Sequence, residues 1–70
     1  MLQEEIIIVL RQRRRVLAVT QEQVAELSGV GLRTIKEIES GKGNPTFTTL
    51  GRIADVLGME LKLEVKQSIK

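Results

Sequence analysis

The residues between Thr20 and Ser40 constrain the fold more than any other part of the chain. Thr20 and Gln23 have the spacing of a capping box, in which each side chain bonds the backbone of the other and a helix begins. Gly29 ends that helix after about two turns, and a second helix is expected over 32–40. A turn this short lets the second helix project steeply from the first. Apolar residues at helical spacing hold the two helices together: Val24, Ala25, Ile35 and Ile38.

A further helix is expected before this pair, over about 2–17. Apolar residues recur along it near helical spacing at Leu2, Ile6, Leu10 and Leu17. A strand is the competing interpretation of the β-branched run at 6–9, but acids near the start and arginines near the end favour a helix. The apolar run is expected to belong to the core, with a partner surface as the alternative.

A last helix is expected from a Thr46 cap to about Leu57, where Gly58 ends it. Its inward face is expected to hold Phe47, Leu50, Ile53, Ala54 and Leu57. In the helix after Thr20, Leu27 is expected to point inward beside Val24.

The tail at 59–66 changes period, because apolar and charged residues alternate strictly along it. This alternation is typical of a half-buried strand. A lone strand leaves unpaired edges, so we expect it to pair with the same strand of a second copy, where opposite charges can meet. The alternatives are a tail that folds back on its own chain or stays frayed. The residues expected to form the dimer contact are Met59, Leu61, Leu63 and Val65.

The chain has 70 residues and contains neither cysteine nor histidine. One small domain buries a thin core, and disulfides and the common zinc sites are excluded, so homodimerisation is the simplest remaining source of stability. No metal or cofactor is expected. The apolar run at 6–10 is far too short to span a bilayer, and no basic segment and small-residue cleavage site frame it as a secretion signal. We therefore expect a cytoplasmic protein without a membrane partner.

The basic residues are grouped, although the formal net charge is only +2. They concentrate at 11–15 and 33–42, and a local basic face binds phosphate even on a nearly neutral protein. Phe47 is the sole aromatic residue, which argues against proteins that stack single-stranded bases on aromatic rings. Double-stranded DNA remains, because arginine, lysine and amide side chains read its grooves.

Many positions between about 7 and 58 keep a characteristic spacing together. They are Thr20-Gln21, Val24-Ala25, Gly29-Val30, Thr34-Ile35, Ile38-Glu39, Gly41-Lys42, Asn44-Pro45, Leu50, Ile53-Ala54 and Leu57-Gly58. This set resembles the Cro/CI, or Xre, family of helix-turn-helix DNA-binding proteins. The resemblance implies a mainly α fold, a lambda-repressor-like domain of four short helices over 1–58. The strand-like tail at 59–66 resembles HipB-type antitoxins, which pair their tails in a dimer and bind a HipA-like kinase toxin; 67–70 is expected to be frayed.

The resemblance makes 32–40 the recognition helix, with Leu32, Arg33 and Glu37 at base-reading positions. The chemistry agrees, since an arginine can bond guanine O6 and N7, a glutamate can accept from cytosine N4, and a leucine can touch a thymine methyl. Gln21 resembles the phosphate anchor of the family. Further phosphate contacts are expected from Arg11, Arg13, Thr34, Lys36, Ser40, Lys42 and Asn44.

Some of these residues have a second interpretation. Arg33 and Glu37 are four apart on one helix and can simply pair with each other. Lys42 can be an ordinary loop lysine, and the arginine run can complement a helix end. The resemblance pairs Arg14 with Glu39 as a buried ion pair. Two positions depart from the family pattern: Gly31, where Ser or Thr is common, and Ala18, where Gly is common.

These features predict a homodimeric transcriptional repressor that binds a near-palindromic operator, and the tail favours an autoregulating antitoxin over a free-standing regulator. The alternative is a protein-interaction module that neutralises a toxin or scaffolds a partner, with weak or no DNA binding. An enzyme is not expected. The chain lacks His, Cys and a Gly-rich phosphate loop after a strand, and its carboxylates show no acid–base arrangement.

Overall fold

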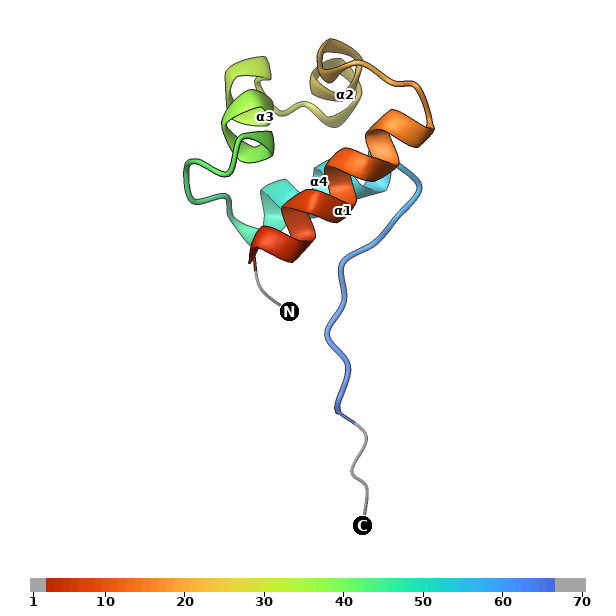
Figure 1. Cartoon of the computed structure of the whole chain (residues 1–70), viewed down its shortest axis with the longest axis vertical. Helices are drawn as coiled ribbons and strands as arrows, with labels where there is room; N and C mark the ends of the chain where they lie inside the picture. Colours follow the sequence, from red (N-terminus) through yellow and green to blue (C-terminus); the bar gives the residue numbers. More distant parts are fainter. Residues whose placement is uncertain (1–2, 67–70) are drawn as a thin grey trace.

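Four helices account for the folded part of the chain in the computed structural model, which describes residues 3–66 (Figure 1). They are α1 (Gln3–Val16), α2 (Gln21–Ser28), α3 (Leu32–Glu39) and α4 (Phe47–Val56). The predicted mainly α fold with four helices is therefore confirmed. The frayed segment expected at 67–70 and the predicted first apolar residue Leu2 lie outside the described residues.

Both ends of α2 form as the sequence predicted, and α3 begins shortly after. Thr20 Oγ accepts from the Gln23 amide at 3.0 Å, and the Thr20 amide donates to Gln23 Oε1 at 2.8 Å, which completes the capping box. Gly29 ends α2 at a φ of 76°, in the left-handed region that glycine enters at little cost. Gly31 then precedes α3 in extended conformation without a side-chain cap.

The end of α1 has the same left-handed geometry without a glycine. Ala18 has a φ of 57°. The Ala18 amide donates to Arg15 O at 3.0 Å and the Val19 amide to Arg14 O at 3.1 Å, a pattern that satisfies the last carbonyls of the helix. Ala18, at the position where the resembled family pattern commonly has glycine, therefore adopts the left-handed backbone geometry that favours glycine.

The core lies where α2 packs against both α3 and α4, with α1 packed on α3. Each helix contributes apolar residues at helical spacing to this core. The buried residues are Ile7, Leu10, Val24, Val30, Ile35, Ile38, Leu50, Ile53, Ala54 and Leu57. Ile35 and Ile38 therefore anchor the inner face of α3, as predicted.

Five residues expected in the core are exposed. Ile8 and Val9 of the apolar run in α1 are 45% and 40% exposed, because the buried face of this helix runs through Ile7 and Leu10. Leu17 follows the last residue of α1 and lies in the turn. Leu27 is 69% exposed, because the inner face of the short α2 runs through Val24 and its helical neighbours Gln21 and Ser28. Phe47 is 62% exposed, since it is the first residue of α4 and the packed part of its face begins one turn later.

The tail leaves the end of α4 as an extended chain that points away from the helices (Figure 1). The Met59 amide donates to Ala54 O at 2.8 Å, and Met59 and Leu61 pack against the core. Leu63 and Val65 are each 94% exposed. Residues 59–66 have no strand partner within the described chain, so the predicted strand is not formed inside one copy. No helix among residues 3–66 has the length and apolarity needed to cross a membrane.

Candidate nucleic-acid interface

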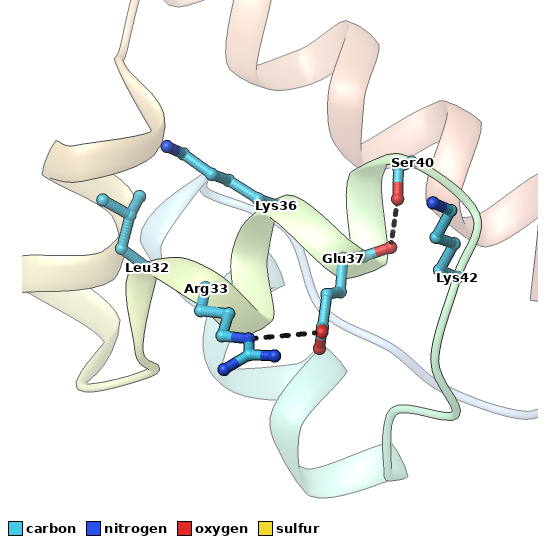
Figure 2. A pocket seen from close by; sticks show the side chains of 6 residues that line it. All are labelled: Leu32, Arg33, Lys36, Glu37, Ser40 and Lys42. Carbon is cyan, nitrogen blue, oxygen red and sulfur yellow. Dashed lines mark hydrogen bonds and ion pairs between the residues drawn. The ribbon is translucent and has the colours of Figure 1, made fainter.

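The outer face of α3 carries a shallow hollow that gathers polar and charged side chains (Figure 2). The hollow is lined by Leu32, Arg33, Lys36, Glu37, Ser40 and Lys42. Because Ile35 and Ile38 fix one face of α3 in the core, the side chains of Arg33, Lys36 and Glu37 on its other faces are exposed. The structure thus brings together the three predicted base-reading residues and three of the predicted phosphate ligands.

Arg33 and Glu37 form a loose ion pair across one turn of α3, with 3.6 Å between Nε and Oε2. The Arg33 side chain is 92% exposed, and that of Glu37 is 49% exposed. An exposed pair of this kind contributes about 0.3 kcal/mol, because water screens it. The pairing interpretation and the base-contact interpretation are therefore compatible, since Arg33 can leave Glu37 at little cost.

The end of α3 is closed by the loop that carries Lys42. Ser40 Oγ donates to Glu37 O at 2.9 Å, and the Lys42 amide donates to the same carbonyl at 2.9 Å. Gly41 makes the turn possible with a φ of 83°. The Lys42 side chain is exposed beside Ser40 at one end of the hollow (Figure 2).

Glu39, the last residue of α3, joins three segments of the chain. Its carboxylate accepts two bonds from Arg14 of α1, from Nε at 2.6 Å and from Nη2 at 2.9 Å. Gln21 Nε2 of α2 donates to Oε1 at 3.1 Å, and Arg14 Nη1 also donates to Val19 O at 2.9 Å. We call Arg14, Gln21 and Glu39 the Glu39 network. It fixes α3 relative to α1 and α2.

The ion pair in this network is largely shielded from water. The side chains of Arg14 and Glu39 are 15% and 12% exposed. The hydrogen bond to Glu39 raises the pKa of Arg14 above its ordinary value, although burial acts in the opposite direction. The Arg14 guanidinium is therefore bonded to groups within the protein.

Arg11 and Arg13 are also bonded within the chain. Arg11 Nη1 donates to Glu39 O at 2.9 Å, at the C-terminal end of α3, where a cation is favoured. Arg13 Nε donates to Leu57 O at 2.9 Å, at the end of α4. Arg11 also borders a hollow with Ser40 and so adjoins the α3 face, whereas the contact of Arg13 is with α4.

The remaining predicted phosphate ligands lie outside the hollow. Thr34 and Asn44 are exposed, on α3 and on the loop after it. The Gln21 side chain is bonded to Glu39, which leaves its backbone amide at the start of α2 as the group that can bind an anion.

Comparison with known proteins decides the family. A family model described as helix-turn-helix matches residues 10–63. The chain belongs to the helix-turn-helix family. It is a DNA-binding transcriptional regulator of the Cro/CI type, not an enzyme. The match extends past α4 into the tail, so it includes the whole interface described above.

Two relatives agree with this assignment. One is an uncharacterized HTH-type transcriptional regulator of Methanothermobacter thermautotrophicus, 41% identical over 51 residues, which cover 73% of this chain and 74% of that protein. The other is the cryptic phage CTXphi transcriptional repressor RstR of Vibrio cholerae serotype O1, 38% identical over 52 residues. That match covers 74% of this chain and 46% of RstR, so the helix-turn-helix protein spans about half of the repressor's length.

The sequence did not reveal three contacts of this helix-turn-helix protein. The bonds from Gln21 to the Glu39 side chain, from Arg11 to Glu39 O and from Arg13 to the end of α4 all join segments far apart in the chain. No local pattern signals any of them, because each depends on how the helices pack. The grouping of arginines at the end of α1 was the available signal, and it indicated cations without indicating their partners.

Proposed function

We propose that this protein is a sequence-specific repressor that binds double-stranded DNA as a homodimer, with α3 in the major groove. The observation that supports this most directly is the outer face of α3. A fully outward arginine, 92% exposed, stands on a helix that the Glu39 network holds in place. A rigid helix with exposed polar groups is what direct reading of base edges requires.

In this proposal Arg33 bonds guanine O6 and N7, Glu37 accepts from cytosine N4, and half-buried Leu32 touches a thymine methyl. The exposed fork of Arg33 supports its role, because its only partner within the hollow is the loosely held Glu37. Leu32 lies at the start of α3, the end that enters the groove first in this type of domain.

Phosphate contacts come from groups around this face. Lys36 and Lys42 supply charge, while Thr34, Ser40, Asn44 and the Gln21 amide supply hydrogen bonds. Arg11 contributes beside Ser40. Arg13 contributes only if DNA displaces its bond to Leu57. Because such contacts release counterions, affinity falls steeply as salt rises.

The homodimer places two α3 helices about one DNA turn apart on a near-palindromic operator. The exposed apolar residues of the tail support dimerisation, since Leu63 and Val65 have no cover within one copy. Pairing of the 59–66 segments as strands would cover one edge of each tail.

Within this function, an autoregulating antitoxin with a HipA-like kinase toxin is the more specific proposal, supported by the strand-like tail. A search of the neighbouring reading frames for a HipA-like kinase, followed by co-expression of the two proteins, tests this role, and relief of kinase-induced growth arrest is the expected result. Relief with no operator binding would favour the alternative protein-interaction module.

Fluorescence anisotropy tests the repressor function directly. The protein is titrated into its own upstream promoter and into a scrambled duplex, at low and physiological salt. We expect promoter binding at least about 100-fold tighter than scrambled, and a loss of that preference in Arg33→Ala. Arg52→Ala is the matched control, because it removes an exposed arginine from α4 instead of α3. Equal binding to both duplexes would contradict the proposal.

A further inference from the structure

The tail has two chemically distinct faces. The Lys62 Nζ and Glu64 Oε2 atoms lie 3.5 Å apart, so residues two apart share a face of this extended segment. Glu60 and Lys66 continue that charged face by the same alternation. The other face holds Met59, Leu61, Leu63 and Val65.

The apolar face is covered only along its first half. Met59 and Leu61 pack against the helices, whereas Leu63 and Val65 are 94% exposed. Within residues 3–66, no backbone hydrogen bond involves residues 60–66. The second half of the tail therefore exposes both apolar side chains and a free backbone edge, which a second extended chain could pair with.

An apolar groove of about 100 Å³ borders the covered half of the tail. It lies between α1, α4 and the tail, and exposed Glu60 is the one charged residue among the described residues that line it. Its apolar lining is Ile6, Val9, Leu10, Ala54, Met59 and Leu61. Val9 is 40% exposed, so this surface extends along α1 beyond what the chain itself covers.

The charges restrict how two tails can pair. In an antiparallel pair the facing residues share one side of the ribbon, so an apolar residue must face an apolar residue. A two-fold axis through a charged residue, Lys62 or Glu64, would place like charges opposite each other. An axis through an apolar residue places glutamate opposite lysine. Three centres satisfy this condition: Leu61, Leu63 and Val65.

We propose that two copies pair their tails antiparallel with the two-fold axis at Leu63, and that Val65 of each copy covers the apolar groove of the other. Glu60 then faces Lys66 of the second copy, and Lys62 faces its Glu64. This register is favoured because it matches every charge from 60 to 66, whereas the other two centres leave part of this segment unpaired. The inference rests on the proposed homodimer and assigns its contact surface.

Packing at the groove explains how two paired tails of this length could be stable. Two isolated strands are marginally stable in water, and packing against helices supplies the missing burial. In this register Val65 of the second copy lies directly beside Leu61, which already packs on the helices at the groove. The two Leu63 side chains meet at the axis and cover each other.

Single-cysteine variants test the register, because the chain contains no cysteine of its own. Leu61→Cys, Leu63→Cys and Val65→Cys are each oxidised mildly and run on a non-reducing gel. Residues at the axis have Cβ atoms about 5 Å apart, within reach of a disulfide after small adjustment. The two copies of residue 61, and likewise the two copies of residue 65, are four residues apart along the ribbon. Their separation is about 13 Å, which a disulfide cannot span.

We expect Leu63→Cys to form at least about 10-fold more covalent dimer than either other variant. A mixture of Leu61→Cys and Val65→Cys is expected to form a covalent heterodimer, because these positions face each other. Preferential cross-linking of Leu61→Cys or Val65→Cys alone would overturn the register. So would equal cross-linking of all three variants, which indicates parallel or disordered tails.

A charge exchange provides a second test on the reduced, full-length protein. Lys62→Glu is expected to raise the dimer dissociation constant about ten-fold, because position 62 then faces Glu64 of the second copy. The double variant Lys62→Glu with Glu64→Lys is expected to return within about three-fold of the original value. Rescue is specific to the Leu63 axis. With an axis at Leu61, the new glutamate at position 62 faces Glu60. With an axis at Val65, the new lysine at position 64 faces Lys66. In both cases like charges remain opposite each other.

The outcomes separate this inference from the proposed repressor function. A cross-link at Leu63 in a protein that does not distinguish promoter from scrambled DNA supports the tail pairing and contradicts the repressor. Specific operator binding with no cross-link at any of the three positions leaves the repressor intact and overturns the tail pairing. A protein that sediments as a monomer at all concentrations overturns the pairing and the proposed homodimer together.

Discussion

The α2–α3 pair and the tail solve the same problem of covering apolar residues in opposite ways. The α2–α3 pair is complete within one chain, because its apolar residues are buried and Glu39 ties α3 to α1 and α2. The tail covers Met59 and Leu61 and then runs on with exposed apolar residues. Under the proposed function, the face of α3 that reads DNA is complete within a single copy, whereas the tail is completed by a second copy.

The largest expected effect comes from breaking the Glu39 network, which is formed within one chain. Arg14→Ala removes both bonds to the Glu39 carboxylate and leaves a largely shielded charge with only Gln21 as a donor. We expect a loss of about 2–3 kcal/mol in the free energy of unfolding. Urea unfolding at fixed protein concentration measures this loss.

Arg15→Ala is the control for that experiment, since Arg15 is the exposed neighbour in the same helix. A change below about 0.5 kcal/mol is expected for it. If both variants unfold at the same urea concentration, the Glu39 network does not stabilise the fold as described.

The next largest effect is expected in the tail, whose apolar residues are only partly covered within one copy. Leu63→Ser leaves the helices untouched, because Leu63 is 94% exposed in one copy, but removes apolar area from the proposed dimer twice. We expect the dimer dissociation constant to rise about 30-fold, equivalent to about 2 kcal/mol, with an unchanged helical circular dichroism signal. Sedimentation equilibrium measures the constant.

Leu27→Ser is the matched control for dimerisation, because Leu27 is also an exposed leucine but lies on α2. A similar loss of dimer in both variants would mean that exposed leucines matter in general, and the contrast between the two regions would disappear.

A smaller effect is expected at the end of α1. Ala18→Gly removes the steric cost of a φ of 57°, partly offset by the greater freedom of glycine in the unfolded chain. We expect a gain of about 0.5–1 kcal/mol in thermal or urea unfolding. A loss of stability would show that the left-handed geometry at Ala18 is not retained in solution.

The smallest effect concerns the start of α3. Gly31 has an extended backbone, and a Cβ there would meet only Thr34 Oγ1 at 4.0 Å. Gly31→Ser therefore adds a capping hydroxyl without a clash, and we expect a gain of a few tenths, about 0.3 kcal/mol. Gly29→Ser should have the opposite sign, because Gly29 has a φ of 76°. Stabilisation by both substitutions would contradict the geometry of this turn.

The same contrast explains which features the sequence predicted. Thr20 and Gln23 act through neighbouring backbone, so the capping box was readable locally, as was the end of α2 at Gly29. The exposed face of α3 also followed from spacing, since Ile35 and Ile38 mark its buried side. The roles of these residues toward DNA stay predictions, supported by family resemblance.

Long-range geometry was less accessible. The inward direction expected for Leu27 and Phe47 was wrong, because each lies near the end of a short helix, where one extra turn decides exposure. Arg13 was expected on phosphate and is bonded to Leu57 O, a carbonyl brought near it only by packing of α1 on the end of α4. The strand at 59–66 stays a prediction, since its formation requires a partner chain.

The alternating charges at the end of the chain have a consequence for design. Under the proposed pairing, the specificity of one tail for another tail of the same sequence comes from four charged residues: Glu60, Lys62, Glu64 and Lys66. A version with four lysines and a version with four glutamates would each repel itself and attract the other. Such an obligate heterodimer could carry two different α3 helices, so that a protein built for symmetric operators would read an asymmetric one.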